Sequence, residues 1–319
     1  MRQLVARLGQ SLIVVFIVTT ISFFVIRAAP GDPFSFESTK LSEEARDRLR
    51  HQAGYDRPVA EQYLRYLGRV ARGDLGQSES RGTTVGAALS AAIPNTLLLV
   101  GVALTLSVGL GIIVGVVQAT KRGGWFDRVS SPVFLVFYSL PDFWGALMML
   151  LLFGYWLHVL PTGYMGDPIM HDFYPFWRRL GDTATHLVLP AATMTLITIA
   201  AIARYQRTAM LEVLPSDFIR TARAKGLTER EIVWRHALRN ALTPMITTLG
   251  LLFPVLLGGA LFVEKVFSWP GMGALTAGAI ESRDYDLVTA SVIVGSVMVV
   301  IGNLIADLLQ AAIDPRVRE

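Results

Sequence analysis

Residues 96–119 read TLLLVGVALTLSVGLGIIVGVVQA, a stretch of 24 residues without a charged side chain. As a helix rising about 1.5 Å per residue, this stretch is longer than the roughly 30 Å hydrocarbon core of a bilayer. A run at residues 129–157 contains Pro141 and Asp142 near its middle, which predicts a kinked span. Further apolar runs lie at residues 10–26, 187–203, 243–263 and 287–306. The sequence therefore predicts an all-α polytopic membrane protein with six transmembrane helices.

Composition supports one membrane domain rather than two soluble ones. Of 319 residues, 52% are hydrophobic and 17% are charged, against about 25% charged residues in soluble domains. The chain contains no cysteine, which excludes disulfides, thiolate metal sites and cysteine nucleophiles together. Arg27 follows the first apolar run, where a cleaved signal peptide needs a small residue, so this run is predicted to stay in place as a spanning helix.

Lysine and arginine in the short loops predict the orientation, because these residues resist translocation. Basic residues are dense in residues 204–239 and few in the loops at the opposite ends of the spans. Six spans then place both chain termini in the cytoplasm. The basic residues assigned to the cytoplasmic side outside the dense segment are Arg2, Arg7, Lys121, Arg122, Arg128, Arg316 and Arg318.

The same pattern divides the chain into four parts. These are an N-terminal transmembrane helix (residues 1–29), an external segment (30–93), a five-helix core (94–312) that contains a cytoplasmic loop (204–243), and a cytoplasmic tail (313–319). In the external segment, Ser42 begins one expected helix and Gly54 ends it, while Pro58 begins a second. The second helix would have an apolar face formed by Val59, Tyr63, Leu67 and Val70. Either a cap over helix ends or a docking and solute-funnelling platform fits this segment.

The cytoplasmic loop predicts two short helices joined by a tight turn. Asp217 follows Ser216 at a helix start, and Gly226 supplies the left-handed stop of a helix over residues 218–225. Thr228 and Glu231 form a capping box for a second helix that runs towards residue 240. Such a basic element can bind anionic lipid headgroups. A projecting turn with apolar residues also fits a groove on a partner protein, and those residues are Phe218, Ile219, Ala222 and Leu227.

This loop resembles the coupling motif of ABC importer permeases of the dipeptide and oligopeptide class. Relative to the general motif, Arg220 stands at the glutamate position, His236 at the isoleucine position and Arg239 at the proline position, as is usual in the peptide class. The resemblance assigns ATPase coupling to Asp217, Phe218, Arg220, Thr221, Ala222, Arg223, Lys225, Gly226, Leu227 and Leu238. Matching motifs of the B-type permease begin at Pro30, Tyr63, Arg72, Leu160, Leu187, Val263, Trp269 and Ile313.

The resemblance implies a type I importer transmembrane domain in a bacterial or archaeal cytoplasmic (inner) membrane. It also implies a heterodimer with a second, similar permease, two ATPase subunits inside and a solute-binding protein outside, with no nucleic acid among the partners. No Walker-type glycine loop occurs in the sequence. We therefore expect no cofactor on this chain, with ATP and magnesium used by the ATPase subunits. The solute itself stays open among dipeptides, oligopeptides, glutathione, nickel chelates and sugars.

Two sets of residues are candidates for contact with solute or with the binding protein. Asp142 lies deep within an apparent span, and an intramembrane carboxylate suggests function. Asp142 and Phe143 are therefore candidates for the transport pathway. In the alternative interpretation, Asp142 only caps the helix after Pro141 or faces water near the inner end of the span. At the outer end of a later span, the candidate contacts with the binding protein are Glu264, Lys265 and Trp269.

Two other classes of function fit the sequence less well. An intramembrane enzyme needs catalytic groups at membrane depth, but all five histidines fall in loops or at span ends, and neither His-Glu-x-x-His nor Gly-x-Ser-x-Gly occurs. We therefore expect no catalytic residues and no metal site. An ion-driven secondary transporter would show internal repeats and broken or charged midplane helices. Only Asp142 meets that criterion.

Overall fold

The computed structural model describes the backbone of residues 2–28, 44, 47–48, 51, 54 and 56–313. Within these helices the side chains of residues 2–8, 243–251 and 309–313 are not described. The expected helix that begins at Ser42, the motif at Pro30 and the tail after Ile313 lie outside the described residues.

The chain forms two compact units. One contains residues 1–95 and 271–300, and the other contains residues 96–270 and 301–319. This grouping differs from the sequence-based division because residues 271–300 belong with the N-terminal part. The reason is that contacts between distant segments define a unit, and apolar runs carry no information about those contacts.

The first unit contains the N-terminal span and the helix that begins after Pro58. Its elements are α1 (Arg2–Ala28), α4 (Val59–Ala71), the antiparallel pair β1 (Gln77–Ser78) and β2 (Thr83–Thr84), the start of α5 (Val85–Thr120), α13 (Met272–Glu281) and most of α14 (Tyr285–Ile313). Pro58 occupies the N-cap of α4, as predicted. Phe23 of α1 stacks on Tyr66 with 5.2 Å between ring centroids, which fixes α4 against α1. Burial raises the pKa of the Tyr66 hydroxyl, so it stays neutral.

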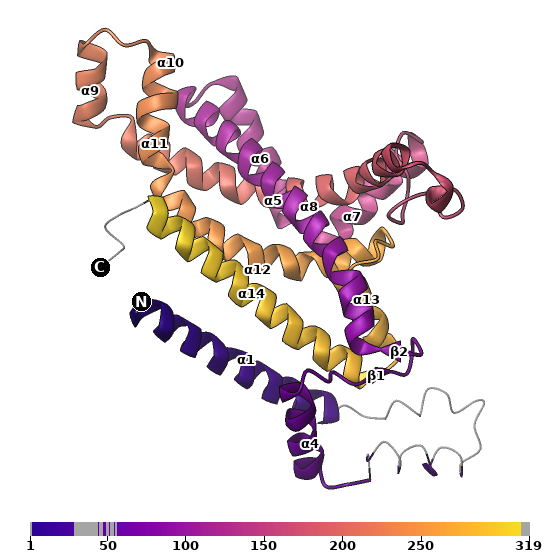
Figure 1. Cartoon of the computed structure of the whole chain (residues 1–319). Coiled ribbons are helices and arrows are strands. Elements are labelled where there is room, and N and C mark those ends of the chain that lie inside the picture. Colours follow the sequence, from indigo (N-terminus) through magenta and orange to yellow (C-terminus); the bar gives the residue numbers. More distant parts are fainter. Residues whose placement is uncertain are drawn as a thin grey trace. The chain divides into compact units, whose positions relative to one another are not determined.

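The second unit contains the remaining spans and the loop between α8 and α12, both drawn in Figure 1. The membrane helices are the rest of α5, α6 (Trp125–Ser139), α7 (Asp142–Met149) with the π-helix η1 (Leu150–Trp156), α8 (Phe176–Val213) and α12 (Thr243–Val266). A short 3-10 helix, η2 (His171–Phe173), lies in the loop before α8. The loop between α8 and α12 forms α9 (Asp217–Ala224), α10 (Glu229–Glu231), the π-helix η3 (Ile232–Ala237) and α11 (Leu238–Ala241).

The predicted spans are confirmed as helices. Among the residues whose side chains are described, four helices have the length and apolarity to cross a membrane: Gly9–Ala28, α5, α8 and Tyr285–Leu308. The run at residues 129–157 is a broken span, because α6 and the α7–η1 segment meet at 110°. The run at residues 243–263 corresponds to α12, a helix of 24 residues. Proline lies inside four of these helices, at Pro94, Pro132, Pro190 and Pro254.

The core of the second unit lies where α5, α7, α8 and α12 meet. Its fully buried residues include Leu99, Ala146, Leu189 and Val263. Towards the C-terminal end of α5, this helix approaches α8 so closely that a Cβ added to Gly115 would lie 2.6 Å from the Ala203 carbonyl oxygen. Glycine at this position lets two helix backbones touch, which is a common way of packing helices in lipid.

Candidate functional site

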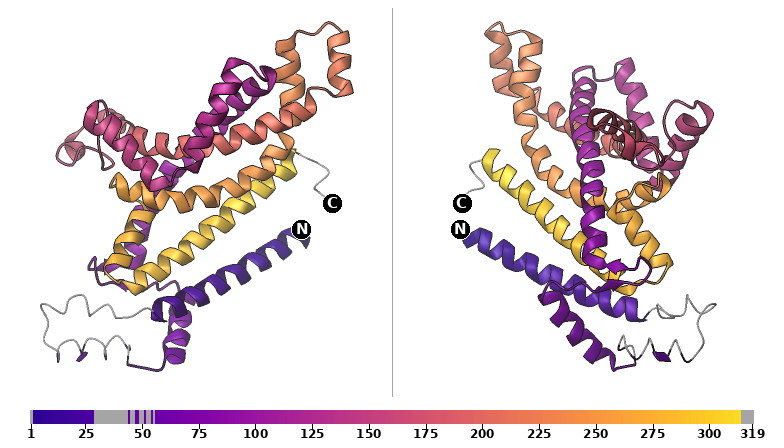
Figure 2. Two further views of the ribbon diagram at one scale, coloured as in Figure 1. Left: turned by 180° about the vertical axis from the view of Figure 1, so that it is seen from behind. Right: turned by 45° about the vertical axis from the view of Figure 1, so that its right-hand side comes forward.

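The loop between α8 and α12 has the two-helix structure that its capping residues predict. Ser216 occupies the N-cap of α9, and Gly226 follows the helix with φ of +80°. No atom lies within 4 Å of a Cβ built on Gly226, so glycine is required there by backbone conformation alone. In the views of Figures 1 and 2, α9 and α10 project beyond the ends of α5 and α8.

The second helix of the loop begins with the predicted capping box. The Thr228 hydroxyl accepts a hydrogen bond from the Glu231 backbone N–H, and the Glu231 carboxylate accepts one from the Thr228 N–H. Across the turn, Arg223 Nε donates to Glu229 Oε1 over 2.6 Å, which ties α9 to α10. The Arg223 guanidinium lowers the pKa of Glu229, and hydrogen bonds from Thr228 lower the pKa of Glu231. These contacts are present above the ordinary pKa of a glutamate, about 4.5, and are lost only as the pH falls below it.

One face of α9 is packed into a small apolar core. Ile219 is fully buried and Ala222 is 7% exposed. They pack with Val116 of α5, with Met210 of α8 and with Ile232 of η3. The helix α9 packs on η3, and the apolar cluster that they share continues to the ends of α5 and α8.

The opposite face of this element is exposed and carries aromatic and basic side chains. Phe218 is 45% exposed and Trp234, which the sequence analysis missed, is 44% exposed. Trp234 belongs to the π-helical turn η3, whose extra residue per turn disrupts the regular spacing that would have revealed it. Exposed predicted residues are Asp217, Arg220, Thr221, Arg223, Lys225, Gly226 and Leu227.

Two of the predicted coupling residues do not reach this exposed face. Ala222 is buried, and Leu238 packs against the same core. They support the element from within, because their side chains are used to hold α9 and η3 against the spans. Asp217 is paired with Arg220 on the exposed surface.

Asp142 lies at the break between α6 and α7. It is the first residue of α7, Pro141 occupies the N-cap, and no side-chain hydrogen bond caps the helix. The Asp142 side chain therefore makes no capping hydrogen bond at the start of α7. Within the described part of the chain its carboxylate has no hydrogen-bond or ion-pair partner, and Oδ2 lies against Gly259 of α12, 2.8 Å from where a Cβ would stand. Phe143 is 46% exposed.

The outer end of α12 differs from the expectation of a contact surface. Glu264 and Trp269 are fully buried, and the Thr96 hydroxyl donates to Glu264 Oε1 over 2.6 Å. The Trp269 N–H donates to the Glu264 carbonyl. Burial argues against direct contact of either side chain with a binding protein, because both are used to close the helix end. Lys265 is exposed.

Two of the histidines assigned to loops converge on one carboxylate, which the sequence spacing did not reveal. His171 Nδ1 lies 2.6 Å from Asp182 Oδ2, and His186 Nδ1 lies 3.3 Å from Asp182 Oδ1. The Asp167 N–H also donates to Asp182. This cluster fastens the outer loop to the start of α8. Among the described residues no group of three or more acidic, histidine or cysteine side chains could hold a metal ion.

The fold and the site define a polytopic helical membrane component with a structured loop between two of its spans. Family models match most of the chain: "Binding-protein-dependent transport system inner membrane component" over residues 107–319 and its N-terminal counterpart over residues 1–97. The chain belongs to this family of binding-protein-dependent membrane transport components. Such components are permease subunits of ABC importers and not enzymes.

Relatives of known role are similar over nearly the full length. The oligopeptide transport system permease protein AppB of Bacillus subtilis is 38% identical over 94% of both chains. The dipeptide permease DppB of Escherichia coli is 36% identical over 94% of both. The glutathione permease GsiC of Pectobacterium atrosepticum is 34% identical over 95% of this chain and 94% of the relative.

Solved structures show the same fold. The inward-facing MetNI methionine ABC transporter superposes with a TM-score of 0.57 at 18% identity, over 71% of this chain and 96% of that chain. The type I importer transmembrane fold predicted from the sequence is thereby confirmed.

The conformation of Gly226 gives a prediction with a matched control. A residue with a Cβ in the left-handed region costs about 1–2 kcal/mol, whereas asparagine tolerates it better. We expect Gly226→Val to speed amide hydrogen exchange in residues 217–225 by about tenfold, and Gly226→Asn to change it little. Hydrogen–deuterium exchange with mass spectrometry on the membrane complex measures both. Equal exchange in the two variants would contradict the role given to the backbone angle.

Proposed function

We propose that the chain is one of two similar permease subunits of an ATP-driven importer of dipeptides or oligopeptides. The peptide assignment is supported by the relatives, which are named for oligopeptides, dipeptides and the tripeptide-like glutathione. An external binding protein would deliver the solute, and two ATPase subunits would supply the energy. The chain itself would bind no cofactor, and the ATPase subunits would bind and use ATP and magnesium.

The observation that carries the proposal is the construction of the cytoplasmic loop. Its exposed face, with Phe218 and Trp234 among basic side chains, is suited to a groove on a protein partner. Its buried face is fixed to α5 and α8 through Ile219 and Met210. A displacement of the partner is therefore passed to spanning helices, which is what coupling of ATPase closure to transport requires.

Reconstitution tests this function directly. We expect the complex of both permeases and ATPases in proteoliposomes to raise its ATP hydrolysis several-fold when the peptide-loaded binding protein is added. Binding protein without peptide is the control. The same complex with Gly226→Val should either lose its ATPase subunits or hydrolyse ATP without peptide uptake. Normal coupled uptake by this variant would return the loop to the alternative of lipid-headgroup binding.

The transport pathway is proposed to pass the break between α6 and α7. An unpaired carboxylate at membrane depth is costly, so Asp142 is suited to meet a polar solute or the second permease there. Phe143 lies beside it, with its ring centroid 6.3 Å from that of Phe262. Lys265 is the remaining candidate for contact with the binding protein.

We expect Asp142→Asn to slow peptide uptake by about fivefold. The substitution removes one charge contact, and a contact of about 1 kcal/mol lost from the rate-limiting step corresponds to that factor. The yield of assembled complex should stay unchanged, because Asp142 caps no helix. Asp172→Asn, in the exposed outer loop, is the matched control. Radiolabelled peptide uptake per assembled complex measures the effect, and uptake at the parental rate would remove Asp142 from the pathway.

Both termini are proposed to lie in the cytoplasm, with α4 outside. Because the chain lacks cysteine, single substitutions can report the orientation without background from this subunit. A membrane-impermeant maleimide should label Glu79→Cys in intact cells, but Lys121→Cys and Arg230→Cys only after permeabilisation. These three residues are exposed. Labelling of Arg230→Cys in intact cells would invert the topology.

A further inference from the structure

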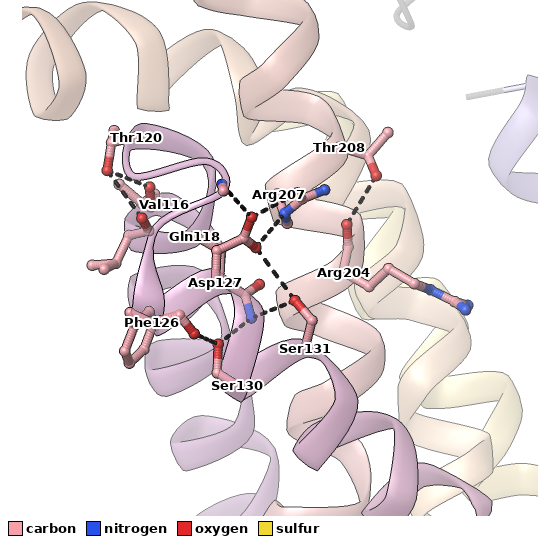
Figure 3. Close-up of polar contacts among 12 residues, drawn as sticks. Val116, Gln118, Thr120, Phe126, Asp127, Ser130, Ser131, Arg204, Arg207 and Thr208 are labelled. Atoms are coloured by element: carbon pink, nitrogen blue, oxygen red, sulfur yellow. Dashed lines mark hydrogen bonds and ion pairs between the residues drawn. The ribbon is translucent and has the colours of Figure 1, made fainter.

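A partly buried ion pair joins α6 to α8 at the inner ends of these helices, with the Asp127 side chain 7% exposed and the Arg207 side chain 29% exposed. Arg207 Nε donates to Asp127 Oδ1 over 2.9 Å, and Arg207 Nη2 donates to Asp127 Oδ2 over 3.0 Å (Figure 3). The Gly123 N–H and the Ser131 hydroxyl donate to the same carboxylate, over 2.9 and 3.3 Å. Two-point binding between a guanidinium and a carboxylate fixes orientation as well as distance.

The helix α5 belongs to the same assembly. Gln118 of α5 donates to the hydroxyl of Ser130 in α6 over 2.8 Å. On its other side, α5 touches α8 at Gly115, where a Cβ would lie 3.0 Å from the Arg207 backbone nitrogen. The inner ends of α5, α6 and α8 are thus joined pairwise by side-chain bonds or by backbone contact.

This three-helix block carries the cytoplasmic loop. Arg207 lies one turn before Met210, which is fully buried against the loop core, and α8 ends at Val213, shortly before α9 begins. At its other end α6 stops at Ser139, immediately before the 110° break. The ion pair therefore joins α8, the helix that leads into the loop, to α6, the helix that ends at the break.

We propose that Asp127 and Arg207 form a permanent strut that makes α6 move together with α8 and the cytoplasmic loop. Displacement of the loop by the ATPase then reaches the break at Pro141 and Asp142 through α6. The two residues are positioning residues, since they act through the helices that they join and do not contact solute or nucleotide. The inference rests on the proposed coupling role of the loop.

The strut predicts uncoupling without loss of assembly. In reconstituted complexes, Asp127→Asn and Arg207→Gln should each raise the ATP hydrolysed per peptide transported by at least about fivefold. The double variant should be no worse than either single one, because both remove the same connection. Arg204→Gln is the matched control, since Arg204 lies three residues earlier on α8 and contacts the rings of Tyr138 and Tyr205. This control should leave the ratio unchanged.

A cross-linking experiment separates a mechanical connection from a merely stabilising charge pair. The complex that carries both Asp127→Cys and Arg207→Cys should hydrolyse ATP without proportionate peptide uptake as long as both thiols are reduced. A short bifunctional thiol reagent that bridges the two cysteines should restore the parental ratio of ATP to peptide. Restoration supports the strut, because a covalent bridge replaces the connection and not the charges.

Three outcomes would overturn the strut: a parental ratio in both single variants, a fall in assembled complex with a parental ratio in what remains, or a bridge that blocks uptake. A parental complex that shows no stimulation by the loaded binding protein contradicts the proposed function instead. The two failures are therefore distinguishable.

Discussion

The absence of water from the bilayer core is the constraint on which the rest of the structure depends. Each backbone N–H and C=O must find a partner within the protein, so the chain crosses lipid as helices and interrupts them only where local bonds remain. The break in the third span obeys this rule: the Leu140 N–H bonds to the Phe137 carbonyl, and the Pro141 carbonyl accepts from Trp144 and Gly145. A sharp change of direction is thereby possible at membrane depth.

The same constraint explains how spans are held together. Apolar surfaces give helices little reason to associate in lipid, so close backbone approach and polar bonds do this work. Gly115 provides the former against α8, and Asp127 with Arg207 provides the latter. These contacts join α5, α6 and α8 near the loop that follows α8, which is the basis of the strut proposed above.

The sequence predicted those features that depend on neighbouring residues. Charge-free runs predicted the spans, and the residues around Gly226 and Thr228 predicted the turn and capping box, because each is set within a few positions. The pairing of Asp127 with Arg207 joins positions 80 residues apart, and the burial of Glu264 depends on Thr96 of another helix. Such contacts depend on how helices pack against one another, and local residue patterns do not reveal that packing. The 110° angle at the break is of the same kind, since a proline predicts interruption but not direction.

The prolines inside the membrane helices have a mechanical consequence. Proline has no backbone N–H, so a helix with an interior proline lacks one backbone hydrogen bond permanently. The prolines concerned are Pro94, Pro132, Pro190 and Pro254. A kink at such a point breaks no existing bond. The positions at which these four helices lack a backbone hydrogen bond are therefore set by the sequence itself, and no step of a transport cycle has to break that bond.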